Sequence, residues 1–160
     1  MSQNIHFYQR NAQRLAGDYL DVSFESVHAS WKPYWLGANE QYMRVLDIGA
    51  GSGRDAKWFA ELTSVMELGV RFELILVSAV WMHIPRSERK RAFRNLAKLL
   101  MPNGKLVFSL RHGIFEDGRI HHGVSTDEID LLAKEHALHV SLKRNYLQIL
   151  WGALMCSGRR

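Results

Sequence analysis

A short run rich in glycine is the part of this 160-residue sequence whose residue types point most directly to chemistry. Val45 to Ile48 is apolar except for Asp47, and Gly49, Gly51 and Gly53 follow at alternate positions. Glycine lets a backbone turn sharply and lets a ligand approach where a Cβ would block it. The Asp47 carboxylate would repel a pyrophosphate and attract a positively charged ligand. The run therefore predicts a buried strand, a tight turn and a small-molecule site.

The same run departs from the dinucleotide-binding fingerprint. That fingerprint, G-x-G-x-x-G, needs a third glycine where this sequence has Arg54. Together with the charge of Asp47, this departure argues against a nicotinamide or flavin dinucleotide. A helix is expected from about Asp55.

Two further groups of polar residues follow predicted strands. Phe72 to Val80 is almost continuously apolar, as expected of a parallel strand covered on both faces, and His83 comes shortly after it. Arg111 and His112 follow the next predicted strand, Lys105 to Leu110. Ligands of open α/β sheets bind at the carboxyl ends of the strands, which makes all three residues site candidates. The alternative is that they pack or turn the chain.

At this point the sequence resembles a known family. Val45 to Asp55 resembles motif I of class I S-adenosylmethionine-dependent methyltransferases. Phe72 to Pro85 resembles the fourth strand of that family and the loop after it, and Leu99 to Leu106 resembles the turn into its fifth strand. Tyr8 to Ala12 is similar to a segment in which an N-terminal helix of the family caps the cofactor. The resemblance covers roughly residues 5 to 140.

The resemblance implies S-adenosyl-L-methionine as the cofactor and a small-molecule methyl acceptor as the partner. No metal is expected, because the adjacent His121 and His122 have no further residue at metal-ligand spacing. The glycines would shape the loop under the methionine part of the cofactor, and Asp47 would brace that loop or meet the amino group. Cofactor contacts are thus expected from Tyr8, Arg10, Asp47, Gly49, Gly51, Gly53 and Ser78. His83 would be a general base, since the ordinary histidine pKa is near ~6.5. Substrate contacts are expected from Trp81, Arg111 and His112, although Trp81 also suits a core position.

One departure from the family concerns length. Only residues 56–71 separate Asp55 from Phe72, whereas a complete family fold needs about 45 residues there for two helices and two strands. The second and third strands are therefore expected to be missing. The acid that would hold the ribose hydroxyls is missing with them, since Glu61, Glu67 and Glu73 do not end an apolar strand.

The missing strands leave three topologies open. The helix after motif I crosses to the opposite face of the sheet, or the strand at Phe72 takes the vacant side of the first strand, or the connection is left-handed. Each of these costs native packing, so we expect the shortened chain either to be marginally stable or to expose the unpaired edge of its first strand.

The remaining elements complete a Rossmann-like α/β fold, a three-layer sandwich around a mainly parallel, shortened sheet. We expect one domain, residues 1–160, with an N-terminal helical cap at 1–40 and an α/β core at 43–160. A basic amphipathic helix is expected at 86–100 and a capping box at Ser125 to Glu128 opens another helix. Leu138 to Leu142 and Leu147 to Met155 offer the last strands.

Composition narrows the partners. The net charge of +5 leaves nucleic acid open, with the basic helix as its contact, but no aromatic residues interleave with those cations to stack bases. A solvated helix face is the simpler interpretation. The single cysteine and the lack of a spanning apolar run favour a cytoplasmic protein. Besides an active enzyme, a degenerate fold that serves as an interaction module stays open, and the oligomeric state is not predicted.

Overall fold

The computed structural model describes residues 3–29, 32–35, 44–52, 71–113, 115–146 and 151–158. Its helices are α1 (Gln3–Leu20), α2 (Phe24–His28), α3 (Lys32–Trp35), the 3-10 turn η2 (Trp81–His83), α5 (Arg86–Leu99) and α6 (Thr126–Glu135). Its strands are β1 (Val45–Ile48), β2 (Phe72–Ser78), β3 (Leu100–Arg111), β4 (Leu138–Tyr146) and β5 (Trp151–Gly158). None of the described helices is long and apolar enough to cross a bilayer.

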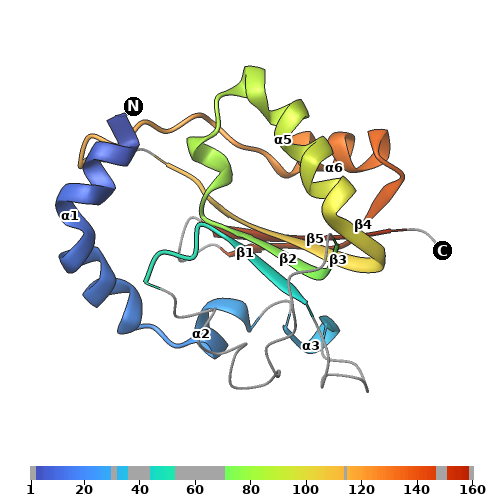
Figure 1. Ribbon diagram of the computed structural model, residues 1–160, viewed down its shortest axis with the longest axis horizontal. Coiled ribbons are helices and arrows are strands. Elements are labelled where there is room, and N and C mark those ends of the chain that lie inside the picture. The colour runs from blue at the N-terminus through green and yellow to red at the C-terminus, as the bar shows by residue number, and fades with distance from the viewer. Residues whose placement is uncertain are drawn as a thin grey trace.

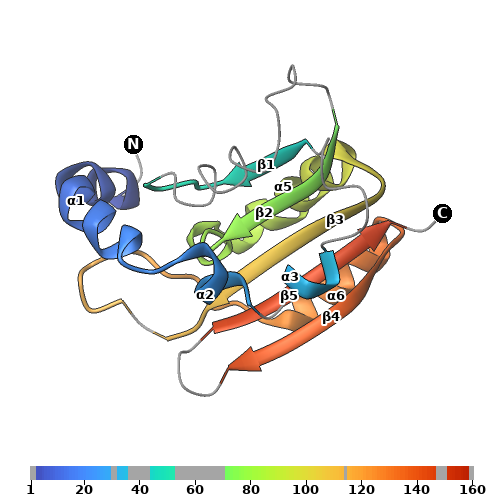
Figure 2. The same cartoon turned by 90° about the horizontal axis from the view of Figure 1, so that it is seen from below.

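The strands form one sheet in the order β1-β2-β3-β5-β4 (Figure 2). β1, β2 and β3 run parallel, in the register Leu46 to Ile75 and Ile75 to Leu106. β5 is antiparallel to both of its neighbours. The prediction of a mainly parallel α/β sheet is therefore confirmed.

The sheet lies between layers of helix. α5 and α6 cover one face, and the short α2 and α3 lie over the other face (Figures 1 and 2). The main core fills the space under α5 and α6, because alternate side chains of β2 and β3 point there. It contains Ile75, Val77, Trp81, Phe93, Leu96, Leu106, Phe108, Leu110, Ile129 and Leu132. The intervening Leu74, Leu76 and Val107 are also buried, as expected of strands covered on both sides.

Helix α1 stands at the end of the sheet where β1, β2 and β3 terminate, and it belongs to neither face (Figure 1). The chain reaches that end three times, through the glycine turn after β1, through η2 after β2, and through residues 112–125 after β3. The carboxyl ends of the parallel strands and the N-terminal helix are thus brought together.

Several predicted boundaries need correction. The strand expected at Lys105 begins at Leu100, and the Pro102 to Gly104 turn forms an irregularity, since Phe72 pairs with Leu100 and Leu74 with Lys105. The last strand is Trp151–Gly158; 147–150 lie outside the described residues. The described part of the N-terminal cap forms separate helices: α1 ends at Leu20, and the Ser23 hydroxyl then caps α2 by accepting from the Ser26 N–H.

The expected loss of the second and third strands fits this sheet. In the described part of the chain, β1 pairs only with β2, so the first strand lies at an edge. The connection from β1 to β2, the helix expected from Asp55, and the acids Glu61 and Glu67 lie outside the described residues. Which of the three topologies applies therefore stays open.

Candidate active site

The glycine turn after β1 has the backbone that its sequence predicts. Gly49 has φ +82° and Gly51 has φ +58°, values in the left-handed region that other residues seldom adopt. A Cβ on Gly49 would overlap Val80, whereas a Cβ on Gly51 would lie 3.6 Å from the ring of Tyr19 on α1. Both glycines are exposed. The turn therefore presents bare backbone toward the N-terminal helix.

The ends of β2 and β3 are joined by hydroxyl groups. Ser78 Oγ lies 3.2 Å from Ser109 Oγ, and the Ala79 N–H donates to Ser109 Oγ at 3.0 Å and to the Ser109 carbonyl at 3.1 Å. Ala79 itself has φ +54°. These bonds hold a strained residue in place and fix the point where the chain leaves β2 for η2.

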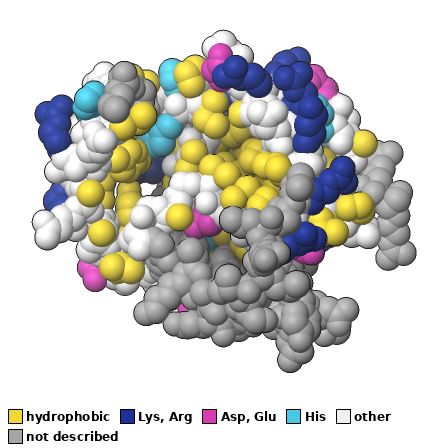
Figure 3. Space-filling model, in the orientation of Figure 1, with side chains coloured by type: hydrophobic (Ala, Val, Ile, Leu, Met, Phe, Trp, Pro, Cys, Tyr) yellow, Lys and Arg dark blue, Asp and Glu magenta, His cyan; other side chains and the backbone are white. Residues whose placement is uncertain are grey.

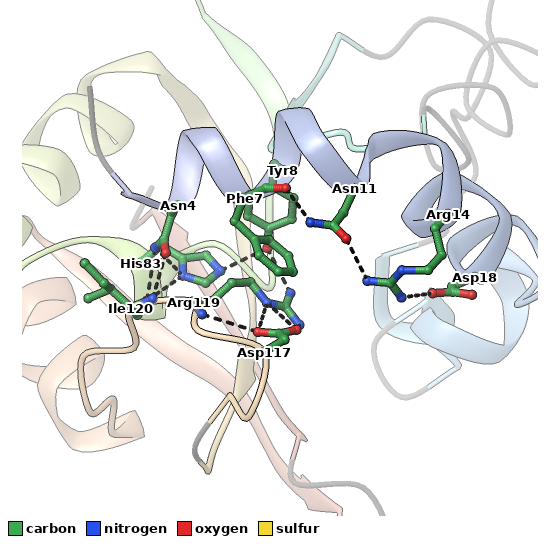
Figure 4. A network of polar contacts seen from close by, with 10 residues as sticks. All are labelled: Asn4, Phe7, Tyr8, Asn11, Arg14, Asp18, His83, Asp117, Arg119 and Ile120. Carbon is green, nitrogen blue, oxygen red and sulfur yellow. Dashed lines mark hydrogen bonds and ion pairs between the residues drawn. The ribbon is translucent and has the colours of Figure 1, made fainter.

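His83 lies at the centre of a network between α1 and the loop after β3 (Figure 4). Its Nδ1 lies 3.0 Å from the Ile120 carbonyl and 3.1 Å from Asn4 Nδ2. We assign the proton to Nδ1, because the carbonyl can only accept and Asn4 Nδ2 already donates to that same carbonyl. Nε2 is then left as an acceptor, and the Tyr8 hydroxyl donates to it at 3.2 Å. Asn4 holds the same loop, since Oδ1 accepts from the Ile120 N–H at 2.7 Å and Nδ2 donates to its carbonyl at 3.0 Å.

Arg119 continues this network. Its Nη1 donates to the Tyr8 hydroxyl at 3.1 Å, and its Nη2 and Nε bind the Asp117 carboxylate at 2.7 and 3.0 Å. Tyr19 of α1 also takes part through hydrogen bonds with Tyr8 and Arg119. A directed chain of hydrogen bonds thus runs from Arg119 through Tyr8 to His83.

Burial and charge set the protonation of these groups. Burial lowers the pKa of His83, and the neighbouring Arg119, His121 and His122 lower it further, whereas the bond to Ile120 raises it. Burial also lowers the pKa of Arg119, but its bonds to Asp117 and Tyr8 outweigh burial and raise it overall. His83 is consequently neutral at pH 7 and Arg119 is charged.

The structure brings most of the predicted site residues to this end of the sheet. Tyr8, Gly49, Gly51, Ser78 and His83 lie on the elements that meet there. Asp47 is half-buried in β1, two residues before the turn, and Arg111 and His112 are half-buried at the end of β3. Arg10 is exposed on α1, and Gly53 lies outside the described residues.

Trp81 requires a correction. It was expected among the substrate contacts, but it is 0% exposed and its ring packs edge-on against Phe93 and Phe108 in the core. The first residue of η2 faces inward, and the third, His83, faces the network. Trp81 is therefore a core residue beneath the site and not a substrate contact.

Glu73 is excluded as a ribose ligand by its position. It lies near the beginning of β2, where its carboxylate accepts from the Arg44 backbone N–H at 2.8 Å and pairs with the Arg44 guanidinium at 3.3 Å. That end of the sheet is opposite the glycine turn. Of the three acids considered in the sequence, Glu73 is the one that the structure describes, and it does not reach the site, as its place at the start of a strand predicts.

Several residues of the network were not predicted from the sequence. They are Asn4, Tyr19, Ser109, Phe115, Asp117, Arg119 and Ile120. Asn4 and Ile120 are 116 positions apart in the chain, and no local pattern of residues predicts a contact over that separation. The strand-end rule that selected Arg111 could have found Ser109, which lies two residues before it.

Comparisons with known proteins address the fold. No protein-family model matches the chain, and no curated protein matches its sequence. The N-methyltransferase NodS from Bradyrhizobium japonicum WM9, solved with S-adenosyl-L-homocysteine, is 15% identical with a TM-score of 0.71, over 99% of this chain and 100% of that one. The DhpI complex with the same ligand is 12% identical with a TM-score of 0.70, over 98% and 96%. The 1,6-didemethyltoxoflavin-N1-methyltransferase from Burkholderia thailandensis is 16% identical with a TM-score of 0.62, over 100% and 92%.

These likenesses agree with the sheet order and the glycine turn. The chain has the Rossmann-like α/β fold of class I S-adenosylmethionine-dependent methyltransferases, with a shortened sheet.

Proposed function

We propose that this protein is a methyltransferase that uses S-adenosyl-L-methionine and a small-molecule acceptor. The observation that carries the proposal is the glycine turn after β1, with Gly49 and Gly51 at positive φ and with Gly51 beside Tyr19 of α1. Class I methyltransferases of the same fold have been solved with S-adenosyl-L-homocysteine bound, among them NodS and DhpI. The acceptors named for similar structures are small molecules.

The residues of the turn fit the methionine end of this cofactor. Gly49, Gly51 and the intervening Ala50 offer exposed backbone, and Gly51 has space where a side chain would contact Tyr19. Asp47 offers the negative charge that a ligand ammonium requires. When bound, the cofactor would supply an electrophilic methyl group on a sulfonium.

The fit at the adenosine end is incomplete. Glu73 is held by Arg44 at the far end of β2, and no other strand of the described part pairs with the outer edge of β1. We therefore propose that this protein holds its cofactor mainly through the glycine turn and α1, and more weakly than a family member with a complete sheet.

His83 suits the role of a base in this proposal. It is neutral, its proton is fixed on Nδ1 by Ile120, and its Nε2 accepts a hydrogen bond. Because the Tyr8 hydroxyl is the group that donates to Nε2, a proton from an acceptor reaches His83 through Tyr8 or after Tyr8 has been displaced. Tyr8 is thereby proposed as a second residue of the proton path.

A binding experiment tests the cofactor. Isothermal titration of S-adenosyl-L-homocysteine into the parent protein should give a micromolar dissociation constant. Gly51→Val should abolish binding, because the side chain fills the space beside Tyr19, and Asp47→Ala should weaken it through loss of charge.

Ala137→Val is the control for the glycine turn. Ala137 is exposed between α6 and β4 and has φ +56°, so valine there adds a branched side chain at a left-handed backbone position away from the turn. This variant should bind as the parent does. If the parent itself binds no S-adenosyl-L-homocysteine, the chain is an interaction module with a methyltransferase fold.

The nucleic-acid alternative gains little from the basic helix. Arg89 is buried, and two of the exposed cations of α5 pair with acids, Lys90 with Glu135 and Arg91 with Glu88. A steep salt dependence of RNA or DNA binding would revive this alternative. The single cysteine remains the basis for proposing a reducing, cytoplasmic location.

A further inference from the structure

Arg111 differs from Arg119 in making no ion pair with the described residues, although its charge also acts on Asp117 and lowers the pKa of that carboxyl. It is the last residue of β3, at the carboxyl end of the parallel strands, and it is half-buried. Its guanidinium carbon lies 4.4 Å from the centre of the Phe115 ring. A guanidinium whose face rests on a ring keeps its N–H donors at its edge, where they can meet an acceptor in plane.

Arg119 provides an internal comparison, because it contacts the same ring. Its guanidinium carbon lies 4.0 Å from the centre of Phe115, but its donors are occupied by the Asp117 carboxylate and the Tyr8 hydroxyl. Of the two arginines on Phe115, Arg119 is therefore bound to protein groups, whereas the Arg111 guanidinium makes no hydrogen bond to the described residues and can bind a ligand.

The position of Arg111 relates it to His83. Phe115 stacks on the His83 imidazole with ring centres 5.4 Å apart and an interplanar angle of 25°. Arg111 and His83 are thus neighbours of one ring, at the ends of adjacent strands. The space-filling view shows a hollow between α1 and the body of the molecule, with hydrophobic and histidine side chains beside it (Figure 3).

The charges around this point favour an anion. The charges of Arg119 and Asp117 offset each other through their two-point contact at 2.7 and 3.0 Å. Arg111 therefore remains as a positive charge without an ion-pair partner among the described residues, and such a charge attracts a negatively charged group more strongly than a neutral one.

We propose that Arg111 binds an oxyanion, a carboxylate or a phosphate, of the methyl acceptor and so places the acceptor beside His83. The proposal rests on the function proposed above and adds the chemical class of the substrate. A planar fork of N–H donors suits both oxyanions, because each offers two oxygens at the spacing that the fork requires.

The test uses simple probes in place of the unidentified acceptor. Benzoate, phenyl phosphate and the neutral benzamide are titrated into the protein by calorimetry, with and without saturating S-adenosyl-L-homocysteine. One or both anions should bind at least tenfold more tightly than benzamide, and the tighter of the two identifies the oxyanion. Equal binding of benzoate, phenyl phosphate and benzamide would overturn the proposal.

Three variants assign the binding to Arg111. Arg111→Met should weaken anion binding tenfold or more, and Arg111→Lys, which keeps the charge but loses the fork, should fall between Met and the parent. Arg94→Met removes an equal charge from the exposed face of α5 and should stay within twofold of the parent. An equal loss in Arg94→Met and Arg111→Met would mean that the anions respond to net charge alone.

A second readout locates the anion. A negative charge bound at Arg111 favours the protonated imidazole, so the NMR titration of His83 should move to higher pH when the anion saturates the protein. An unchanged His83 titration would show that the anion binds elsewhere. Titration of S-adenosyl-L-homocysteine alone judges the proposed function separately, since Arg111-dependent anion binding can persist in a chain that binds no cofactor.

Discussion

Gly49 is required by two separate features of its surroundings. Its φ of +82° is costly for a residue with a Cβ, and the Cβ position overlaps a methyl group of Val80. The first feature belongs to the backbone and the second to the side chain of one neighbour. Substitutions can therefore separate them.

We expect Gly49→Ala to lower the free energy of unfolding by roughly 2–4 kcal/mol, combining backbone strain with overpacking against Val80. Adding Val80→Ala should recover the overpacking part, so the double variant is more stable than the sum of the single changes predicts. Gly118→Ala, in open space at φ +86°, should show only the strain, about 1 kcal/mol. Urea denaturation measures all four, and strict additivity would contradict the assigned overlap.

The lowered pKa of His83 gives stability a dependence on pH. Above about pH 6.5 the imidazole is neutral in both the folded and the unfolded chain. As the pH falls below that value, His83 binds a proton in the unfolded chain. In the folded chain it stays neutral until the pH reaches its lowered pKa. Stability contributed by neutral His83 is therefore lost on acidification.

His83→Gln should reduce the loss of stability between pH 7 and pH 5 relative to the parent, because the variant has no proton to take up at this position. Urea unfolding at half-unit intervals measures the slope. His6→Gln, which changes an exposed histidine of α1, is the control variant. Parallel slopes for the parent and His83→Gln would contradict the structure.

At the scale of elements, Arg89 joins parts of the chain that the sheet alone does not connect. It is 1% exposed on α5, and its guanidinium donates to the carbonyls of Ile84, His122 and Gly123. It also binds the Glu128 carboxylate at 2.6 Å. Helix α5, the loop after β3 and the first turn of α6 are thereby held in register.

The burial of Arg89 corrects the sequence analysis, which placed it on a solvated helix face. The spacing contained a signal for burial, because Arg89 precedes Phe93 by four positions and Leu96 by seven, the separations that define one face of a helix. The charge of Arg89 favoured an exposed position, whereas its spacing from Phe93 and Leu96 favoured a buried one. Glu128 shows the same effect, since Ser125 caps α6 as predicted while the Glu128 carboxylate turns to Arg89.

Arg89→Met should destabilise the protein by about 3–5 kcal/mol, because it leaves a carboxylate and three carbonyls without their buried donor. A chain of this size should then melt roughly 10 °C lower. Arg94→Met, an exposed change on the same helix, should shift the melting temperature by no more than about 2 °C. If Arg89→Met does not fold, Arg89→Lys should fold with an intermediate melting temperature. A parent-like melting temperature in either Arg89 variant would contradict this role.

At the scale of the whole molecule, the sequence was sufficient to predict the main strands and the glycine turn but not the polar network around His83. Strands such as Phe72–Ser78 follow from local apolar runs, and the glycine turn follows from residue type, because both depend on neighbours in the chain. The pairing of Tyr8 with His83 and of Asn4 with Ile120 depends on how α1 docks. The position of α1 depends on tertiary contacts between residues far apart in the chain. The spacing of residues along the sequence does not predict such contacts.

The shortened sheet leads to a prediction about affinity. A family-like segment of about 35 residues inserted after Ala60, with two strands and a terminal acid, should tighten binding of S-adenosyl-L-homocysteine at least tenfold. A carboxylate that accepts two ribose hydroxyls makes charge-assisted hydrogen bonds of roughly 1.5–3 kcal/mol each, and tenfold requires only about 1.4 kcal/mol. Calorimetry compares the two chains. The same insert with the acid replaced by alanine is the control, and equal affinity in all three would refute the idea.

The order of strands in the sheet has a consequence for biosynthesis. β5 follows β4 in the sequence but lies between β3 and β4, so neither of these strands meets its final neighbour until residues 151–158 have been made. A nascent chain that has extended only to Tyr146 carries two strands whose hydrogen-bonding edges await the same missing partner. During that interval the exposed edges are open to pairing with other chains, and a chaperone that shields them would matter most there.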